Sequence, residues 1–225
     1  MQNSPVARKR GRPAIKSTPH PYHHGSLPDA LLHAAEAVLR RDGLRGLTLR
    51  AIAREAGVSH TAPQHHFGDT AGVLSELAAS GHRRLAQFMA HRAAAAGEDR
   101  ERQHAIAHGY IDFAVENPDL FRLMSRNELL DTNRPSLVEA RRMSARGLAG
   151  VFETASADEP VTHVDEGTSA FGQTARAQAI AMASAWAYVH GLASLLIDKR
   201  LDGLAAATGA FGTPRELVDA VIDDL

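Results

Sequence analysis

The chain has 225 residues, 44% of them hydrophobic, with no cysteine and a formal net charge of −1. This length allows one larger domain or two unequal ones with a substantial core, and the lack of cysteine excludes disulfides and thiolate metal sites. Alanine, leucine and charged residues outnumber runs of β-branched or aromatic residues, so we expect an all-α fold.

The charge is divided unevenly along the chain. Residues 1–92 contain 13 Lys and Arg against 6 Asp and Glu, whereas residues 93–225 contain 12 against 20. A basic N-terminal part followed by an acidic remainder indicates a protein of which only one end contacts nucleic acid.

Residues 1–25 are basic and proline-rich, contain no acidic residue, and are expected to form a disordered arm without the apolar segment of a signal peptide. Arg8, Arg10 and Arg12 lie in the segment RKRGRP, whose Arg-Gly-Arg-Pro core resembles an AT-hook. An extended arginine-rich segment fits the narrow minor groove of A·T-rich DNA, so we expect that role for the arm. The alternative is a solubilising tail that contacts phosphates without preference.

Residues 47–67 are expected to form two short helices joined by a tight turn. Thr48 is the expected N-cap of the first helix, and Gly57 is its expected stop, because glycine enters the left-handed region without a Cβ penalty. Ser59 is expected to cap a second helix that begins at His60. This pattern is typical of a helix-turn-helix, whose second helix lies in the DNA major groove.

Residues 26–74 resemble the DNA-binding domain of the TetR family of bacterial transcriptional regulators. The segment YHHG at 22–25 and the later segment WAYVHG at 186–191 resemble one branch of that family. The resemblance of the domain itself rests on Ala35, Val38, Gly43, Thr48, Ile52, Ala53, Ala56, Gly57, Val58, Ser59, His66, Phe67 and Leu74.

Two positions depart from the family pattern. Gln64 stands where the family usually has a tyrosine, and Thr70 where it usually has a lysine. Both usual residues contact phosphates, so Gln64 either keeps a weaker backbone contact or reads adenine through its side-chain amide. The complete predicted DNA-binding set is Arg8, Arg10, Arg12, Thr48, Ser59, His60, Thr61, Gln64, His65, His66 and Thr70.

The chain is expected to divide into the arm at 1–25, a DNA-binding domain at 26–70 and a ligand-binding and dimerisation domain at 71–225. Asn117 is expected to cap a helix that starts at Pro118. Further helices are expected at about 70–95, 100–117, 135–154, 174–201 and 213–225, with a mobile loop at 156–172.

Between Arg176 and Asp198 lie 21 residues without a charged side chain, which is long enough to cross a bilayer. Polar residues and many alanines within the segment favour a buried helix of a globular protein instead. Ala183, Ala187, Gly191 and Ser194 give this helix a face of small residues. The last helix carries an apolar stripe, formed by Leu217, Val218, Val221, Ile222 and Leu225. In the TetR family the last two helices form a four-helix bundle across a twofold axis, so the resemblance implies a homodimer through them.

Aromatic and methionine residues of the helical body are candidates for the lining of a ligand pocket, although such residues also form ordinary cores. The predicted set is Phe88, Phe113, Phe121, Met124, Met182, Trp186 and His190, with His108 as a further candidate. Neighbouring histidines such as His65 and His66 point about 100° apart on a helix, so we expect no metal site and no other cofactor.

These features predict a cytoplasmic regulator of the TetR type, a repressor that binds a palindromic operator as a homodimer and is released by a small organic effector. The first alternative is a DNA-binding regulator without an effector, controlled by its own abundance. The second is an enzyme with its site in the helical body. The sequence contains no nucleophile–base pair, glycine-rich phosphate loop or metal-ligand spacing, so we do not expect an enzyme.

Overall fold

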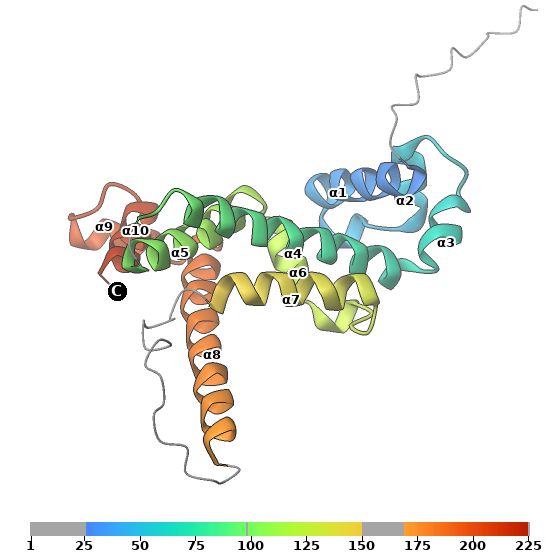
Figure 1. The fold of residues 1–225 in the computed structure, drawn as a ribbon. Helices are drawn as coiled ribbons and strands as arrows, with labels where there is room; N and C mark the ends of the chain where they lie inside the picture. Colours follow the sequence, from blue (N-terminus) through green and yellow to red (C-terminus); the bar gives the residue numbers. More distant parts are fainter. Residues whose placement is uncertain (1–25, 98, 150–168, 225) are drawn as a thin grey trace, which may run out of the picture.

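The computed structural model describes residues 26–97, 99–149 and 169–224, and within these ranges the secondary structure is entirely helical. The predicted arm at 1–25 and most of the predicted loop lie outside the described residues. The helices, drawn in Figure 1, are α1 (Leu27–Gly46), α2 (Leu49–Ala56), α3 (Ala62–Phe67), α4 (Thr70–Ala94), α5 (Asp99–Glu116), α6 (Pro118–Met124), the 3-10 helix η1 (Asn127–Leu129), α7 (Pro135–Ala149), α8 (Ser169–Ile197), α9 (Asp202–Thr208) and α10 (Pro214–Asp223).

Helices α1 to α3 form a small head at one end of the molecule (Figure 1). Helix α1 begins where Ser26 Oγ accepts a hydrogen bond from the amide of Asp29, and it is broken at Gly43, whose φ of 68° is unfavourable for other residues. Its apolar stripe buries Leu31 and Val38 completely. Helix α1 packs against α2.

Helix α4 connects the head to the rest of the protein. Asp69 Oδ1 caps it by accepting from the amide of Gly72 at 2.8 Å, as expected for an acidic N-cap residue. It contacts α1 and α3 of the head and packs against α5, α6 and α7 of the body. A single buried cluster extends from Leu31 in α1 through Leu77 in α4 to Ile222 in α10. The head and the body therefore share one continuous hydrophobic core.

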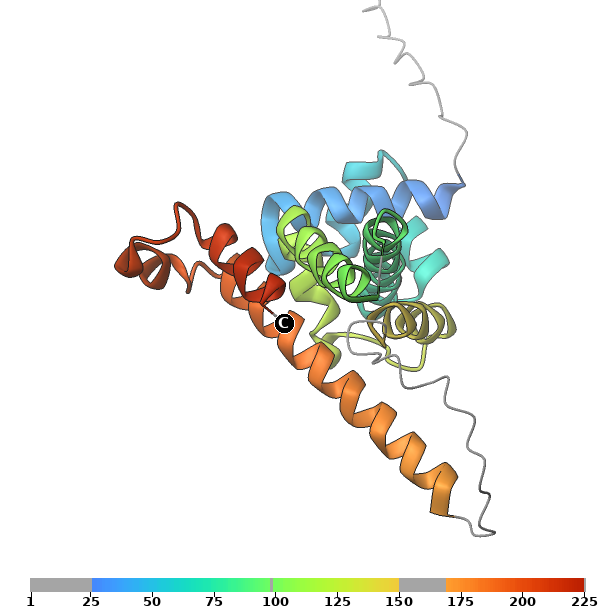
Figure 2. The same cartoon turned by 60° about the vertical axis from the view of Figure 1, so that its left-hand side comes forward.

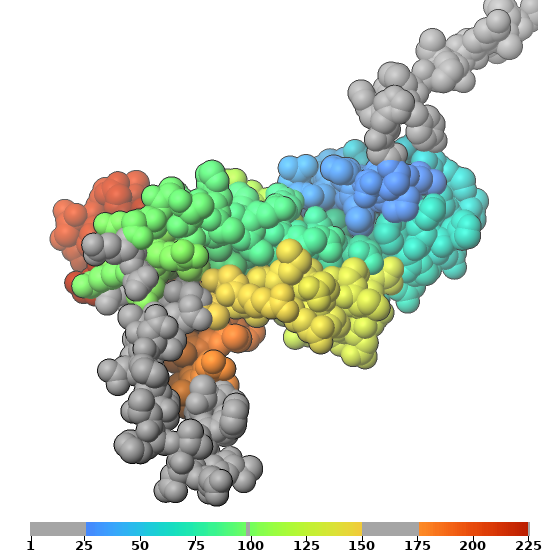
Figure 3. All heavy atoms as spheres, in the orientation of Figure 1, coloured from blue at the N-terminus to red at the C-terminus, as the bar shows by residue number. Residues whose placement is uncertain are grey.

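The body is an elongated stack of helices, with the head at one end and α9 and α10 at the other (Figure 3). Helix α10 is capped by Thr213 Oγ1, which accepts from the amide of Glu216. It turns Val218 and Ile222 inward, while Val221 is left 36% exposed. Within the single chain, the other helices therefore cover only part of the apolar stripe of α10.

Helix α8 projects from the body, and its N-terminal half is separated from the other helices in both views (Figures 1 and 2). Only 17% of the apolar window in its segment Arg176–Ile197 is buried, so the prediction of a buried helix is wrong for the single chain. The buried positions Ala185, Val189 and Ala193 form a narrow line. By length and composition alone the segment would pass as a membrane span. Of its small residues, Ala183 and Ala187 are exposed and Gly191 and Ser194 are half-buried.

Several predicted boundaries are wrong by a few residues. Helix α3 begins at Ala62 rather than His60, and α8 begins at Ser169, so residues 169–172 are helical rather than loop. Helix α8 ends at Ile197, and the short α9 after it was not predicted. Residues 150–154, predicted to end α7, lie outside the described residues. Asn117 precedes α6 as expected, but its side chain makes no cap and instead bonds Phe113 and Arg84.

Candidate DNA-binding surface and ligand cavity

The helix-turn-helix geometry is built by local contacts. Thr48 Oγ1 accepts from the amide of Ala51 at 3.1 Å and starts α2, and Gly57 ends α2 with φ 67° and ψ 30°. Between the two helices, Ser59 Oγ accepts from the amide of Thr61 at 3.2 Å, and the two hydroxyls are 2.7 Å apart. Ser59 therefore closes the turn before α3, which explains why the helix begins two residues later than predicted.

Helix α3 has one buried and one exposed side. Pro63 and Phe67 are buried and hold α3 against the head core. The remaining predicted DNA-facing side chains of this region are exposed, and they are His60, Thr61, Gln64, His65 and His66. Thr70, at the first position of α4, is exposed as well. Arg8, Arg10 and Arg12 lie outside the described residues.

Basic residues of α2 extend this exposed surface. Arg50 and Arg54 are exposed, and neither forms an ion pair with a carboxylate of the described residues. By contrast, Arg41 donates to Glu55 at 2.8 Å and pairs with Asp42. Sequence reasoning did not name Arg50 and Arg54. Their place on the solvent side of an amphipathic helix next to the turn could have identified them as possible phosphate contacts.

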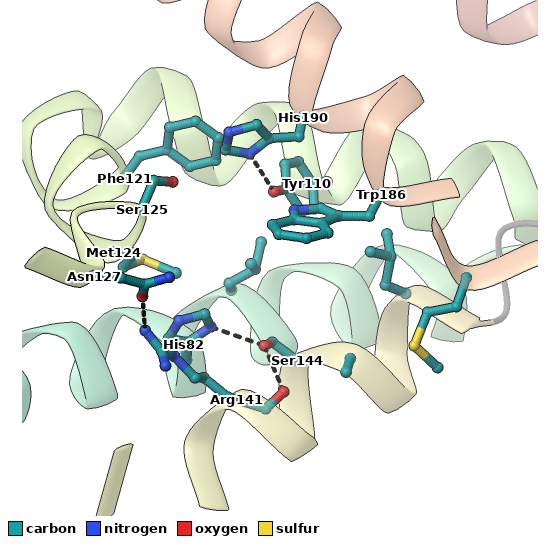
Figure 4. Close-up of a pocket in the computed structure, with 14 residues that line it drawn as sticks. His82, Tyr110, Phe121, Met124, Ser125, Asn127, Arg141, Ser144, Trp186 and His190 are labelled. Atoms are coloured by element: carbon teal, nitrogen blue, oxygen red, sulfur yellow. Dashed lines mark hydrogen bonds between the residues drawn. The ribbon is translucent and has the colours of Figure 1, made fainter. Parts of the chain in front are cut away.

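A cavity of about 630 Å³ lies in the body between α4, α5, α6, α7 and α8 (Figure 4). Of the predicted pocket residues, Phe121, Met124, Met182, Trp186 and His190 line it. The structure places the other candidates elsewhere. Phe113 is fully buried in the core against Phe88, and His108 bonds Asp219 and Asp223 on α10. The residues that sequence reasoning missed are His82, Leu85, Tyr110, Ser125, Asn127, Arg141, Ser144, Ala145 and Leu148.

One end of the cavity is a cluster of rings. The His190 ring stacks on Phe121 with centroids 5.0 Å apart, and Trp186 lies on its other side at 5.9 Å. His190 Nδ1 and the Tyr110 hydroxyl are 3.0 Å apart (Figure 4). Burial raises the pKa of Tyr110 and lowers the pKa of His190, because both charged forms lose hydration. The neutral forms of both residues are therefore favoured in this cluster.

The other end of the cavity is polar. His82 Nδ1 on α4 lies 2.9 Å from Ser144 Oγ on α7, and Arg141 donates to Asn127 Oδ1 (Figure 4). Burial, aided by the Arg141 charge, lowers the pKa of His82 to about 4. Arg141 was missed because two adjacent arginines, Arg141 and Arg142, have the appearance of a solvated charge pair in the sequence. Only the packing of α7 on α4 turns one of the two arginines inward.

Among the described residues, no group of three His, Cys, Asp or Glu side chains could hold a metal ion. The histidines His20, His23 and His24 lie outside them.

An all-helical chain with a helix-turn-helix head and a cavity in its helical body belongs to the class of DNA-binding transcriptional regulators with a separate helical C-terminal part. The family model "Bacterial regulatory proteins, tetR family" matches residues 31–77, and "Tetracyclin repressor-like, C-terminal domain" matches residues 103–225. The chain therefore belongs to the TetR family.

Known proteins agree with this assignment. A solved structure of a protein of unknown function from Rhodococcus sp. RHA1 is 35% identical, with a TM-score of 0.68 over 92% of this chain and 96% of that one. The TetR family regulator PfmR from Thermus thermophilus shares the fold, with a TM-score of 0.56 over 88% and 95% of the two chains at 17% identity. The HTH-type transcriptional regulator YobS of Bacillus subtilis (strain 168) is 28% identical over 40% of this chain. The match spans 47% of YobS, about half of its length.

Proposed function

We propose that this regulator is a homodimeric repressor, that it binds a palindromic operator through α3 of each subunit, and that a small molecule in the body cavity releases it. In this proposal residues 1–25 form the basic arm, residues 26–70 bind DNA, and residues 71–225 bind the ligand and the second subunit. The protein acts in the cytoplasm, where its operator is.

The observation that carries the proposal is the position of α4. It packs against α1 and α3 of the head, with Arg84 paired to Glu36 of α1, and its middle carries His82 and Leu85 into the cavity. A ligand that moves the cavity wall therefore acts on the helix that positions the head. Helix α3 itself is only six residues long, and α4 is the helix through which it packs on the body.

Release by a ligand is a shift between two states. The two recognition helices of a dimer must meet half-sites about 34 Å apart, and the ligand must favour a form in which they do not. Moving the population from about 1:99 to 99:1 requires roughly 5.5 kcal/mol of differential ligand affinity. By linkage, operator DNA must weaken ligand binding by the same factor by which the ligand weakens operator binding.

The dimer is supported by the uncovered faces of α8 and α10. Ala183 and Ala187 are exposed, and a Cβ placed on Gly191 would meet nothing within 4 Å. Trp186 and Ile180 are each 56% exposed on the same helix. An apolar helix with so little cover in the single chain requires a partner surface, and the same helix of a second copy supplies one with matching small residues.

The test begins with selection of genomic DNA fragments on the purified protein, which identifies the operator. Thermal melting against a metabolite library then identifies the effector, because a ligand at one hundred times its Kd stabilises the folded protein by about 2.7 kcal/mol. An effector whose affinity is the same with and without operator DNA would contradict the proposed release. A protein that binds its operator and responds to no metabolite would favour control by abundance.

A further inference from the structure

Among the described residues, the ionisable side chains that line the cavity include basic residues but no acidic one. The described residues that line the cavity include Arg141 and two histidines but neither Asp nor Glu. Arg141 is half-buried, and its hydrogen-bond partner is the neutral amide of Asn127. Two other partly buried arginines have carboxylate partners: Arg84 pairs with Glu36 and Arg134 with Glu76. Arg141 thus carries an uncompensated positive charge at the cavity wall, with donors to spare.

His82 supplies a second unsatisfied group beside Arg141 (Figure 4). Its Nε2 atom is buried and has no hydrogen-bond partner among the described residues, while Nδ1 is bonded to Ser144. The Ser144 hydroxyl donates to the carbonyl of Arg141 at 3.1 Å and lies 2.9 Å from His82 Nδ1. An acceptor oxygen at Nε2 selects the tautomer in which Nε2 carries the proton, and the Ser144 hydroxyl then donates to Nδ1 instead of to that carbonyl. An oxygen ligand would therefore give His82 Nε2 the partner that it lacks, and a buried polar atom without a partner is otherwise costly.

The far side of the cavity suits an apolar group. Phe121, Trp186 and His190 form a ring cluster there, and Met124 and Met182 add flexible apolar surface. A cavity of about 630 Å³ is within the usual range for small organic ligands. The two ends differ in chemistry, so the cavity distinguishes the two ends of a ligand.

We propose that this cavity binds a small amphipathic organic anion, with its carboxylate at Arg141 and His82 and its apolar body against Phe121 and Trp186. The inference rests on the proposed effector function of the same cavity and names the chemical class of the effector. An organic cation would meet Arg141 without any acidic partner in the described lining. A wholly apolar ligand would leave the guanidinium and His82 Nε2 unsatisfied.

The test uses the full chain and two acids, octanoate and 4-phenylbutyrate, each compared with its primary amide and with the amine of the same length. Trp186 is the single tryptophan of the chain and lies in the cavity wall, so its fluorescence reports occupancy directly. Replacing a charge-assisted hydrogen bond by a neutral one weakens binding by roughly tenfold or more. We expect the better-fitting acid to bind saturably and at least about tenfold tighter than its amide, and the amine to bind weakest.

Two neighbouring arginines provide matched variants. Arg141→Gln should lower the affinity for the acid to that of the amide and leave amide binding unchanged. Arg142→Gln is the control, because Arg142 is exposed on the same helix and pairs only loosely with Glu139 at 3.8 Å. Helical circular dichroism and operator binding show whether each variant is folded. Equal affinity for acid and amide, an unchanged acid affinity in Arg141→Gln, or no saturable binding of either acid would overturn the inference.

Operator binding measured with and without the acid separates this inference from the proposed function. If an acid binds through Arg141 but leaves operator affinity unchanged, the anion site is supported and its role in operator release is refuted. If the neutral amide releases the operator equally from wild type and Arg141→Gln, release by a ligand is supported and the preference for an anion is refuted.

Discussion

His82 couples the chemistry of the cavity to the stability of the fold. Burial lowers its pKa to about 4, below the ordinary value of 6.5, because the imidazolium would lose hydration and face the Arg141 charge. Between these two pH values the unfolded chain binds the proton more strongly than the folded one. The stabilising effect of neutral His82 is therefore complete above pH 6.5 and is lost as the pH falls towards 4.

The prediction for this residue concerns the variant His82→Gln. Wild type should lose about 2 kcal/mol of unfolding free energy from this group between about pH 7 and pH 5, and the variant should lack that part of the dependence. Urea unfolding at a series of pH values measures the free energy of unfolding of both proteins. The contributions of the other histidines cancel in the difference between the two. Parallel curves for wild type and variant would show that His82 is not buried as a neutral group.

At the scale of elements, side chains of Ser75 and Glu76 link α4 to the start of α7 and the segment before it. Ser75 is fully buried; its Oγ donates to the carbonyl of Ala71 at 2.7 Å and accepts from the amide of Asp131 at 2.8 Å. Nearby, Glu76 accepts from Arg134 at 2.6 Å and from Ser136 at 2.8 Å. These contacts fix the start of α7, and α7 in turn carries Arg141 and Ser144 to the cavity.

Ser75→Ala should therefore destabilise the protein by about 0.5–1.5 kcal/mol, because the amide of Asp131 loses the acceptor that holds it to α4. Ser80→Ala, on the same helix and without a hydrogen bond of this kind in the described chain, should change stability by less than about 0.5 kcal/mol. Chemical denaturation of the three proteins compares them. A loss in Ser80→Ala as large as that in Ser75→Ala would assign the effect to helix α4 in general and not to this contact.

At the scale of the whole molecule, the uncovered apolar faces predict the assembly. Val221 lies 36% exposed beside the buried Val218 and Ile222, on the last helix. Val221→Asp would place a charge in the proposed dimer interface, so we expect a monomer and at least about tenfold weaker operator binding, since each half-site then binds alone. Sedimentation velocity and operator titration measure the two effects. Ala220→Asp, at an exposed position about 100° from Val221 around α10, should remain a dimer. A dimeric Val221→Asp protein would remove this face from the interface.

The N-terminal arm leads to a second prediction at this scale. Gln64 and Thr70 depart from residues that contact phosphates, and the concentrated basic segment Arg8–Lys16 is the natural replacement. Each neutralised phosphate contributes about 0.9 to the slope of log K against log salt, so deletion of residues 1–16 should flatten the slope by roughly three to five units per subunit. It should also abolish any preference for A·T-rich flanks.

Thr70→Lys in the truncated protein is the matched comparison for the arm. It should recover about one unit of salt slope and none of the flank preference, because a single phosphate contact carries no base information. Fluorescence anisotropy with operator DNA at several salt concentrations distinguishes the three proteins. If truncation changes neither slope nor flank preference, the arm is a tail without a role in binding.

Features governed by neighbours along the chain could be predicted from the sequence. The caps of α2, α4 and α10, the left-handed Gly57 and the exposed side of α3 follow from residues three or four positions apart. The helix-turn-helix and the family assignment rest on such local signals, as does the all-α class. The same reasoning misplaced the start of α3 by two residues, because the Ser59 turn and a helix cap use the same hydroxyl.

Features that depend on contacts between distant helices were decided only by the tertiary structure. Phe88 and Phe121 have the same apolar character in the sequence, yet only Phe121 lines the cavity. Arg141 and Arg142 are adjacent and chemically identical, and the packing of α7 on α4 turns one towards His82 and leaves the other in solvent. An apolar segment such as α8 is equally compatible with a buried helix, a membrane span and a partner surface. Local sequence determines that a helix forms and which side of it is apolar, but which surface covers that side depends on where the rest of the chain lies in space.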